Sequence, residues 1–192
     1  QQFDQIEQLW VQYRDIYSKD YTLENARVVL DYNTRILAAC NDAVVLLEEY
    51  ATQNQDAGDA KTSKDDLRLG AIINMSGRQR MISQRMLLYA VAVNYDLGNQ
   101  EENLTQLRKA IQEFNRNRRV LSLLSKNDKE AIVQHELIDK HWKKLEHLLD
   151  QCLEQETEAS IRRKMLEEAL TTSEAVLFAS DELVFIYERL QG

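Results

Sequence analysis

Proline is absent from this 192-residue sequence, and glycine occurs only five times. Because these two residues most often interrupt or end regular elements, their scarcity favours long, uninterrupted helices. The strong helix formers dominate the sequence instead, led by alanine, leucine, glutamate and glutamine. Hydrophobic residues make up 44% of the chain, which is enough for a packed core. We therefore expect an all-α protein.

Cysteines and long apolar runs are also scarce. The two cysteines, Cys40 and Cys152, fit no CxxC pattern, and we interpret them as two buried thiols rather than as a disulfide. No run approaches the roughly 20 apolar residues of a membrane span, and no signal peptide is visible. We expect a soluble piece, which is either a mature secreted protein or a domain from between flanking spans.

The sequence lacks a basic surface and the usual catalytic patterns. A net charge of -8 argues against a general nucleic-acid binder, and the short basic run at 116–119 is weak evidence for one. No glycine-rich phosphate loop, HExxH pair or cysteine nucleophile setting is present. His135, His141 and His147 do not converge on one helix face, so we interpret them as surface histidines. We expect no enzyme activity, no metal and no cofactor.

Apolar periodicity and turn residues predict the positions of six helices. We expect the fifth helix to be capped by Asn127, with Glu130 at the capping-box position. The polar stretch 53–59 is the clearest linker. The expected helices span about 3–18, 22–52, 63–96, 100–123, 127–152 and 158–190.

These helices suggest two domains, a helical hairpin at 1–55 and an antiparallel four-helix bundle at 63–190. The hairpin resembles a partial copy of the bundle, because residues 36–48 parallel residues 176–188 and a tryptophan stands upstream of each. Trp10 and Trp142 lie at different distances from these segments, so the match needs a gap. Two generic apolar helices are the alternative explanation.

One segment, Asn74–Met86, stands out from the helical pattern. It carries three arginines, Arg78, Arg80 and Arg85, inside a strongly apolar stretch. A cation beside apolar surface is costly unless an anion meets it. This segment is therefore the best candidate for a functional site.

A helical projection gives Arg80 a face of its own. Ile73, Leu87 and Val91 fall within about 20° of it, so Arg80 lies in the middle of an apolar stripe. Two apolar arcs predict two packing partners, the core of the bundle and, most simply, the same helix of a second subunit. The arc expected to face the core contains Ile72, Met75, Ile82, Met86, Tyr89 and Val93.

A twofold axis through such a helix pair would bring two Arg80 side chains together. Gly77, one turn earlier, would allow the two backbones to approach closely. The guanidiniums repel each other, but a small anion between them would make two charge-assisted contacts. Arg80 has no acidic residue within a turn on its own helix, so we expect it to meet an external anion. For Arg78 and Arg85 two interpretations are equally good. One is a role in the site, and the other is an ordinary environment, either solvent-exposed or paired with a neighbouring acid.

The segment Asn74–Met86 closely resembles the signature of PilJ-type domains, the N-terminal family of type IV pili methyl-accepting chemotaxis transducers. The pattern G-x-x-R-M-x-S-x-R, which begins at Gly77, is also similar to that of nitrate/nitrite sensor kinases of the NarX and NarQ type. A looser resemblance covers residues 64–190.

The resemblance implies an extracytoplasmic, periplasmic four-helix sensor module that lies between two membrane spans. It also implies a homodimer formed through the arginine-bearing helix, in which Arg80 of each subunit holds one nitrate. Gly77 matches the position where the backbone approaches the ligand. Ser83 and Arg85 match further motif positions, and Arg78 is a neighbouring candidate.

Two functions of different classes follow from these observations. The first is the ligand-sensing domain of a bacterial signalling receptor, tethered to the membrane in the full-length protein, which binds nitrate or nitrite between paired Arg80 residues. The alternative is a helical protein–protein interaction module, related to pilus or chemotaxis signalling, with no small-molecule ligand. In that case the hairpin at 1–55 could cover the surface that would otherwise dimerise.

Overall fold

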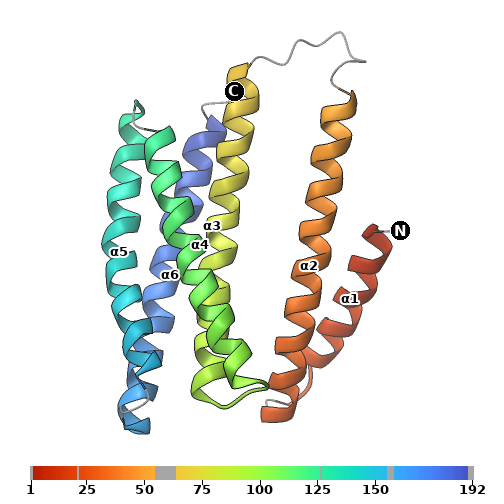
Figure 1. Cartoon of the computed structure of the whole chain (residues 1–192), viewed down its shortest axis with the longest axis vertical. Coiled ribbons are helices and arrows are strands. Elements are labelled where there is room, and N and C mark those ends of the chain that lie inside the picture. The colour runs from red at the N-terminus through yellow and green to blue at the C-terminus, as the bar shows by residue number, and fades with distance from the viewer. Residues whose placement is uncertain (1, 21, 55–63, 126, 155–157, 190–192) are drawn as a thin grey trace. The chain divides into compact units, whose positions relative to one another are not determined.

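The computed structural model describes residues 2–20, 22–54, 64–125, 127–154 and 158–189, which contain helices and short connections but no strand. The expected all-α class is confirmed, and the helix ends agree with the sequence predictions to within a turn. None of the described helices is both long and apolar enough to cross a membrane. The helices, shown in Figure 1, are α1 (Gln2–Tyr17), α2 (Leu23–Asn54), α3 (Lys64–Asn94), α4 (Gln100–Leu124), α5 (Lys129–Leu153) and α6 (Ala159–Arg189).

Two sequence predictions concern residues that lie partly or wholly outside the described part of the chain. The predicted linker at 53–59 lies outside it except at its first two residues, which end α2. The side chain of Cys152 lies outside it as well. Cys40 is a free, partly buried thiol.

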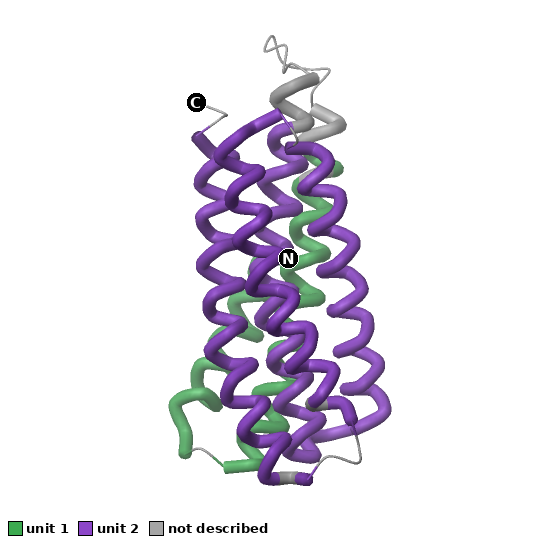
Figure 2. Tube along the Cα trace, turned by 90° about the vertical axis from the view of Figure 1, so that its left-hand side faces the viewer, with its two compact units in different colours: residues 1–62 green, residues 63–192 purple. Residues whose placement is uncertain are grey.

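The chain divides into two compact units, residues 1–62 and residues 63–192, which Figure 2 colours separately. In unit 1, α1 packs against α2, and the side-chain amide of Gln2 donates a hydrogen bond to the carbonyl of Ala39 at 3.0 Å. In unit 2, α3 packs against both α4 and α6, and α5 packs against α6. Contacts between α4 and α5 are sparser.

Large apolar side chains from all four helices fill the core of unit 2. The rings of Phe114 and Trp142, both fully buried, lie with their centroids 4.3 Å apart. Of the α3 residues that we expected to face the core, Ile72, Ile82, Met86 and Tyr89 are buried, whereas Met75 and Val93 are half-buried. The face of α3 that positions its arginines therefore follows from the apolar spacing in the sequence.

The first residue of α5 differs from the sequence prediction. Asp128, and not Asn127, caps the helix, because its carboxylate accepts a hydrogen bond from the backbone N–H of Ala131 at 2.7 Å. Glu130 consequently lies in the first turn, where the helix dipole favours an acid, and not at the capping-box position. Asparagine and aspartate are comparably good N-caps, so two adjacent candidates could not be ranked from sequence.

Candidate functional site

The arginine-bearing segment occupies the middle of α3, and small polar side chains lie on its buried face. Ser76, Gln79 and Ser83 are all buried. The amide nitrogen of Gln79 donates to the carbonyl of Phe114 on α4 at 3.0 Å, and the hydroxyl of Ser76 donates to the carbonyl of Ile72 at 2.9 Å. The Gln79 bond joins α3 to α4, whereas the Ser76 bond lies within α3.

Arg80 pairs with an acid that the sequence analysis missed. Its Nε forms an ion pair with Oδ1 of Asp181, which lies on α6. No acid lies within a turn of Arg80 on its own helix, as the sequence shows, but another helix supplies a carboxylate partner. The physical reason is that α3 and α6 pack side by side, so a residue far away in sequence supplies the charge that the helix itself lacks.

The Arg80–Asp181 pair remains open to solvent and to competing anions. The side chain of Arg80 is 45% exposed and that of Asp181 is 28% exposed. A surface ion pair contributes only about 0–1 kcal/mol to stability. Oδ1 of Asp181, which pairs with Arg80, is itself shielded from water, so the exposed side of the pair is the guanidinium. The guanidinium has five N–H donors, and this pair engages Nε. An external anion can therefore reach Arg80 at a small energetic cost.

Partly exposed apolar residues surround the pair. On α3, Ile73, Leu87 and Val91 are half-buried, as expected for the stripe around Arg80. On α6, Phe178 and Phe185 are exposed, and their spacing of three and four residues from Asp181 places them on the same side of the helix. The result is a charged pair within a largely apolar surface.

Gly77 and Ser83 differ in their access to this surface. A Cβ atom added at Gly77 would meet no other atom within 4 Å, so the packing of the described chain does not require a glycine there. Ser83 is fully buried, and its hydroxyl donates to the backbone carbonyl of Arg80 at 2.7 Å. Ser83 thus contacts Arg80 through the backbone and from the core side.

The other two arginines of the segment have separate partners. Arg78 forms an ion pair with Glu113 of α4 at 2.7 Å, which is one of the two environments that we expected. The guanidinium carbon of Arg85 lies 5.7 Å from the centroid of the Tyr89 ring, in a cation–π contact. The structure therefore does not gather the predicted site residues in one place, because Arg78 and Arg85 point to other neighbours.

A buried polar cluster joins the end of α4 to α5 and α6. Nε2 of His135 lies 2.9 Å from the hydroxyl of Ser125 and 3.0 Å from that of Tyr187. His135 is only 5% exposed, so the expectation of a surface histidine is wrong here, whereas His147 is exposed and His141 is half-buried. The sequence did contain a signal, because His135 has helical spacing to the core residues around Trp142.

The surroundings of His135 favour its neutral form. Burial lowers the pKa of its imidazole and the nearby Arg118 cation lowers it further, although Asp139 opposes both. Among the described residues, Nδ1 is buried without a hydrogen-bond partner, so a second ring proton would have no acceptor. No group of three or more His, Cys, Asp or Glu side chains suited to a metal ion occurs in the described ranges.

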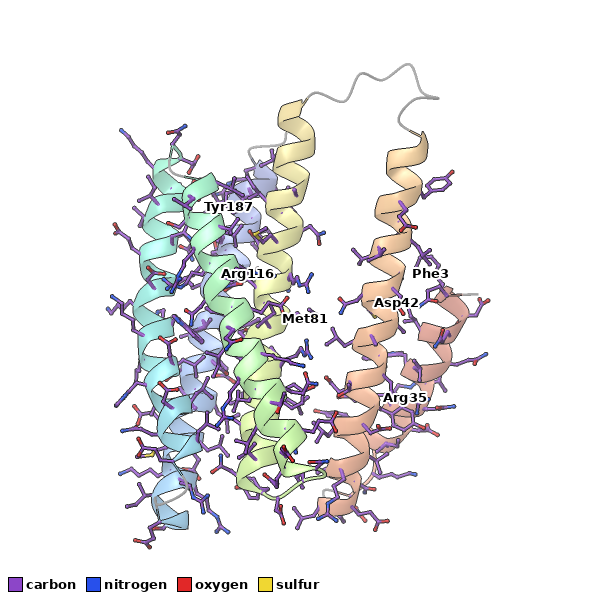
Figure 3. The ribbon with its side chains drawn as sticks, in the orientation of Figure 1. Phe3, Arg35, Asp42, Met81, Arg116 and Tyr187 are labelled. Carbon is purple, nitrogen blue, oxygen red and sulfur yellow. The ribbon has the colours of Figure 1, made fainter. Side chains whose placement is uncertain are left out.

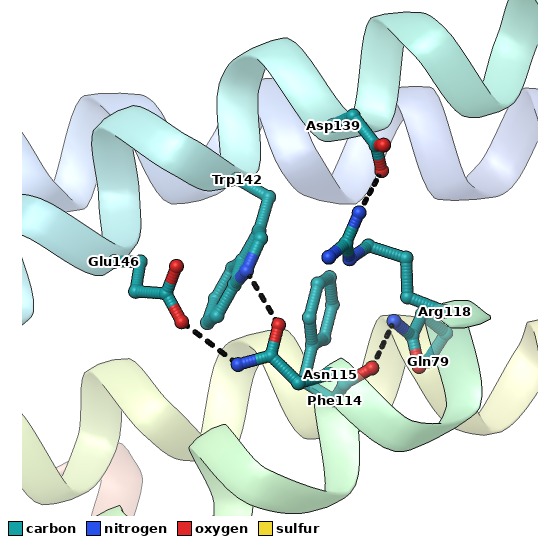
Figure 4. Close-up of polar contacts among 7 residues, drawn as sticks. All are labelled: Gln79, Phe114, Asn115, Arg118, Asp139, Trp142 and Glu146. Atoms are coloured by element: carbon teal, nitrogen blue, oxygen red, sulfur yellow. Dashed lines mark hydrogen bonds and ion pairs between the residues drawn. The ribbon is translucent and has the colours of Figure 1, made fainter.

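Polar side chains also bridge the sparse contact between α4 and α5 (Figure 4). The indole N–H of Trp142 donates to the side-chain oxygen of Asn115 at 2.9 Å. The amide nitrogen of Asn115 in turn donates to Glu146 at 2.7 Å, and Arg118 pairs with Asp139 nearby. These contacts hold the orientation of α4, and therefore of the side chains on its outer face.

Comparison with known proteins places the arginine segment inside a described family. Residues 62–167 match the family "PilJ: Type IV pili methyl-accepting chemotaxis transducer N-term". This range is more than half of the chain and includes Arg80, whereas Asp181 lies beyond it. No curated protein and no solved structure matches the chain. The chain therefore belongs to the PilJ family, the N-terminal domains of type IV pili methyl-accepting chemotaxis transducers.

Proposed function

We propose that unit 2 is the periplasmic ligand-sensing module of a bacterial signalling receptor, and that it binds a small planar oxyanion, nitrate or nitrite, through Arg80. In this proposal α3–α6 form an antiparallel four-helix bundle, two copies pair through α3, and both Arg80 side chains hold one anion. The position of Arg80 is the observation that carries the proposal. Its cationic side chain is half-exposed, it has apolar neighbours, and it lies in the range that matches the PilJ family.

The surface around Arg80 supports an approach by a second copy. Gly77 lies one turn before Arg80, and the absence of atoms near a Cβ at this position leaves space for another backbone. The half-buried residues Ile73, Leu87 and Val91 would lose their remaining contact with water in such a pairing. Nitrate or nitrite is proposed as the ligand on the resemblance to the NarX and NarQ sensors that was drawn from the sequence pattern beginning at Gly77.

The pair between Arg80 and Asp181 offers a route for the signal. It links α3, which carries the anion-binding group, to α6. An anion that engages Arg80 competes with the carboxylate and weakens this link. A ligand can shift an equilibrium only by its difference in affinity for the two states, and we propose that loss of the pair supplies this difference. The shift would then pass along α6.

Thermal unfolding in nitrate and in chloride at equal ionic strength tests the proposal. A ligand present at ten times its dissociation constant stabilises the folded state by about 1.4 kcal/mol, so we expect a higher melting temperature in millimolar nitrate. Arg80→Ala should abolish this increase. Arg78→Ala is the matched control, because Arg78 is an exposed arginine on the same helix and pairs with Glu113 instead. This variant should retain the rise in melting temperature. An equal response to the two salts, or an undiminished nitrate effect in Arg80→Ala, argues against the proposal.

The second candidate function is a protein–protein interaction module with no small-molecule ligand. The exposed aromatic side chains of Phe178 and Phe185 on α6 favour it, because aromatic residues are enriched at protein interfaces. Sedimentation velocity separates the two functions. The sensor proposal predicts a dimer that nitrate strengthens, and the interaction module predicts a monomer that does not respond to anions.

A further inference from the structure

A second cationic surface lies on α4, where Figure 3 labels Arg116. The whole chain has a net charge of -8, yet residues 108–119 carry five basic side chains and one acidic side chain. The basic residues are Arg108, Lys109, Arg116, Arg118 and Arg119, and the acid is Glu113. A local concentration of positive charge on an acidic protein favours an anionic ligand.

An open cavity of about 470 Å³ accompanies this charge. It is a shallow depression that is open to solvent, so a ligand bound there would keep part of its surface in contact with water. The described residues that border it come from consecutive turns of α4, on one face of the helix. They are Gln112, Asn115, Arg116, Arg119 and Val120.

Both arginines at the cavity have positive charges that the described part of the chain does not neutralise. Arg116 and Arg119 are exposed, and no ion pair to either is formed among the described residues. Glu113, the acid one turn before Arg116, is already paired with Arg78 at 2.7 Å. Arg78, Arg80 and Arg118, by contrast, all have carboxylate partners. The guanidiniums at the cavity are therefore available to bind an external anion.

The wall of the cavity at Asn115 is held in place from behind. Its side-chain oxygen accepts from the indole of the buried Trp142 at 2.9 Å, and its nitrogen donates to Glu146 at 2.7 Å. A side chain that is already ordered costs less entropy when a ligand binds. Val120 adds an apolar surface beside these polar groups.

We propose that this cavity binds a small organic anion with at least two carboxylate groups. Each guanidinium presents a planar fork that matches one carboxylate, and the separation of Arg116 from Arg119 by one helical turn suits two such groups on one molecule. The amide of Gln112 is placed to bond to further oxygens, and Val120 contacts the carbon skeleton. This inference does not depend on the anion proposed for Arg80.

Calorimetric titration of the full chain with citrate, at a constant ionic strength set by sodium chloride, tests the site. We expect saturable binding to the wild-type chain and at least about a tenfold loss of affinity in the double variant R116Q/R119Q. R108Q/K109Q is the matched control, because it removes two charges from the same helix outside the cavity. At an ionic strength of about 0.15 M, where charges beyond ~8 Å are screened, the control should bind citrate almost as well as wild type.

The absence of citrate binding to the wild-type chain, or unchanged binding in R116Q/R119Q, would overturn the proposal. An equal loss in the control would also overturn it, because it would show a general effect of charge. Arg80→Ala should bind citrate normally, and a loss there would move the site to α3. Inorganic phosphate should bind at least about tenfold more weakly than citrate, and equal affinity would contradict an organic ligand.

Discussion

The two tryptophans of the chain have opposite environments. Trp142 in unit 2 is completely buried, packs against Phe114 and donates a hydrogen bond to Asn115. Trp10 in unit 1 is 53% exposed and stacks on Tyr13 of the same helix, with ring centroids 5.7 Å apart. A residue with the same apolar area thus becomes part of a core only where several helices surround it.

The helix pair of unit 1 explains this contrast. Two helices can cover only one side of each other, so most apolar residues on α1 and α2 keep contact with solvent. The proposed repeat shows the effect at three positions: Val184, Ile186 and Tyr187 on α6 are buried, and the residues that correspond to them in the alignment of 36–48 are exposed on α2. Those exposed residues are Val44, Leu46 and Leu47.

Truncation of the two tryptophans is the strongest way to sharpen this comparison. Trp142→Ala should lower the free energy of unfolding by about 3–5 kcal/mol, because it leaves a cavity in the core and removes the partner of Asn115. Trp10→Ala should cost less than about 1 kcal/mol, as exposed positions usually do. Urea unfolding followed by circular dichroism measures both values. Similar losses in the two variants would contradict the difference between the units.

All three histidines of the chain lie in unit 2. Any effect of histidine protonation on the free energy of unfolding should therefore come from unit 2. Burial lowers the pKa of His135 below its ordinary value of 6.5, so the unfolded chain takes up this proton first as the pH falls. The contribution of His135 is therefore fully present above about pH 6.5 and is lost below it, with a slope of at most about 1.4 kcal/mol per pH unit. Urea midpoints at several pH values between 5 and 7.5 report this dependence.

Two variants isolate the contribution of His135 to that dependence. His135→Asn removes the titrating group and should flatten the pH dependence between pH 5 and 7. His147→Gln removes an exposed histidine and should leave the dependence as in the wild type. If the two variants change the slope equally, the buried cluster is not the origin of the effect.

The N-terminal cap of α5 predicts a smaller effect within unit 2. Asp128→Ala should destabilise the chain by about 1 kcal/mol, because the N–H of Ala131 loses its acceptor. Asn127→Ala is the matched control, since it changes the neighbouring candidate cap without removing that bond. The same urea experiment measures both. A larger loss for Asn127→Ala would restore the cap that the sequence suggested.

Gly77→Ala should change the stability of a single chain by no more than the loss of the cap does, and with the opposite sign. Alanine favours the helix over glycine by about 1 kcal/mol, and the added Cβ has no neighbour within 4 Å. If two α3 helices meet at this position, the same substitution should weaken the dimer. Sedimentation equilibrium measures the dimer affinity, and an unchanged value would place the dimer interface elsewhere.

Much of the fold follows from local sequence features. The helices and the core arc of α3 could be predicted because they depend on spacing, capping residues and the lack of proline. One error arose where two neighbours had to be compared, because Asn127 and Asp128 are adjacent and comparably good caps. The burial of His135 was indicated by its helical spacing to Trp142 on α5. Its hydrogen-bond partners, Ser125 and Tyr187, follow only from tertiary packing.

The candidate site was harder to predict than the fold. The exposed position of Arg80 and its apolar surroundings follow from the helical projection, but its pairing with Asp181 does not. That contact depends on the register between α3 and α6, which no pattern within one helix specifies. The cavity beside Arg116 and Arg119 was likewise visible in sequence only as a short basic run.

The stoichiometry of nitrate binding tests most directly whether Arg80 holds an anion between two copies of the chain. Calorimetric titration with nitrate should give one nitrate per two chains, no binding in Arg80→Ala, and tighter binding in Asp181→Asn, where the competing carboxylate has been removed. One nitrate per chain would contradict the twofold site. No heat in the wild-type chain, or heat that persists in Arg80→Ala, would contradict the role of Arg80 altogether.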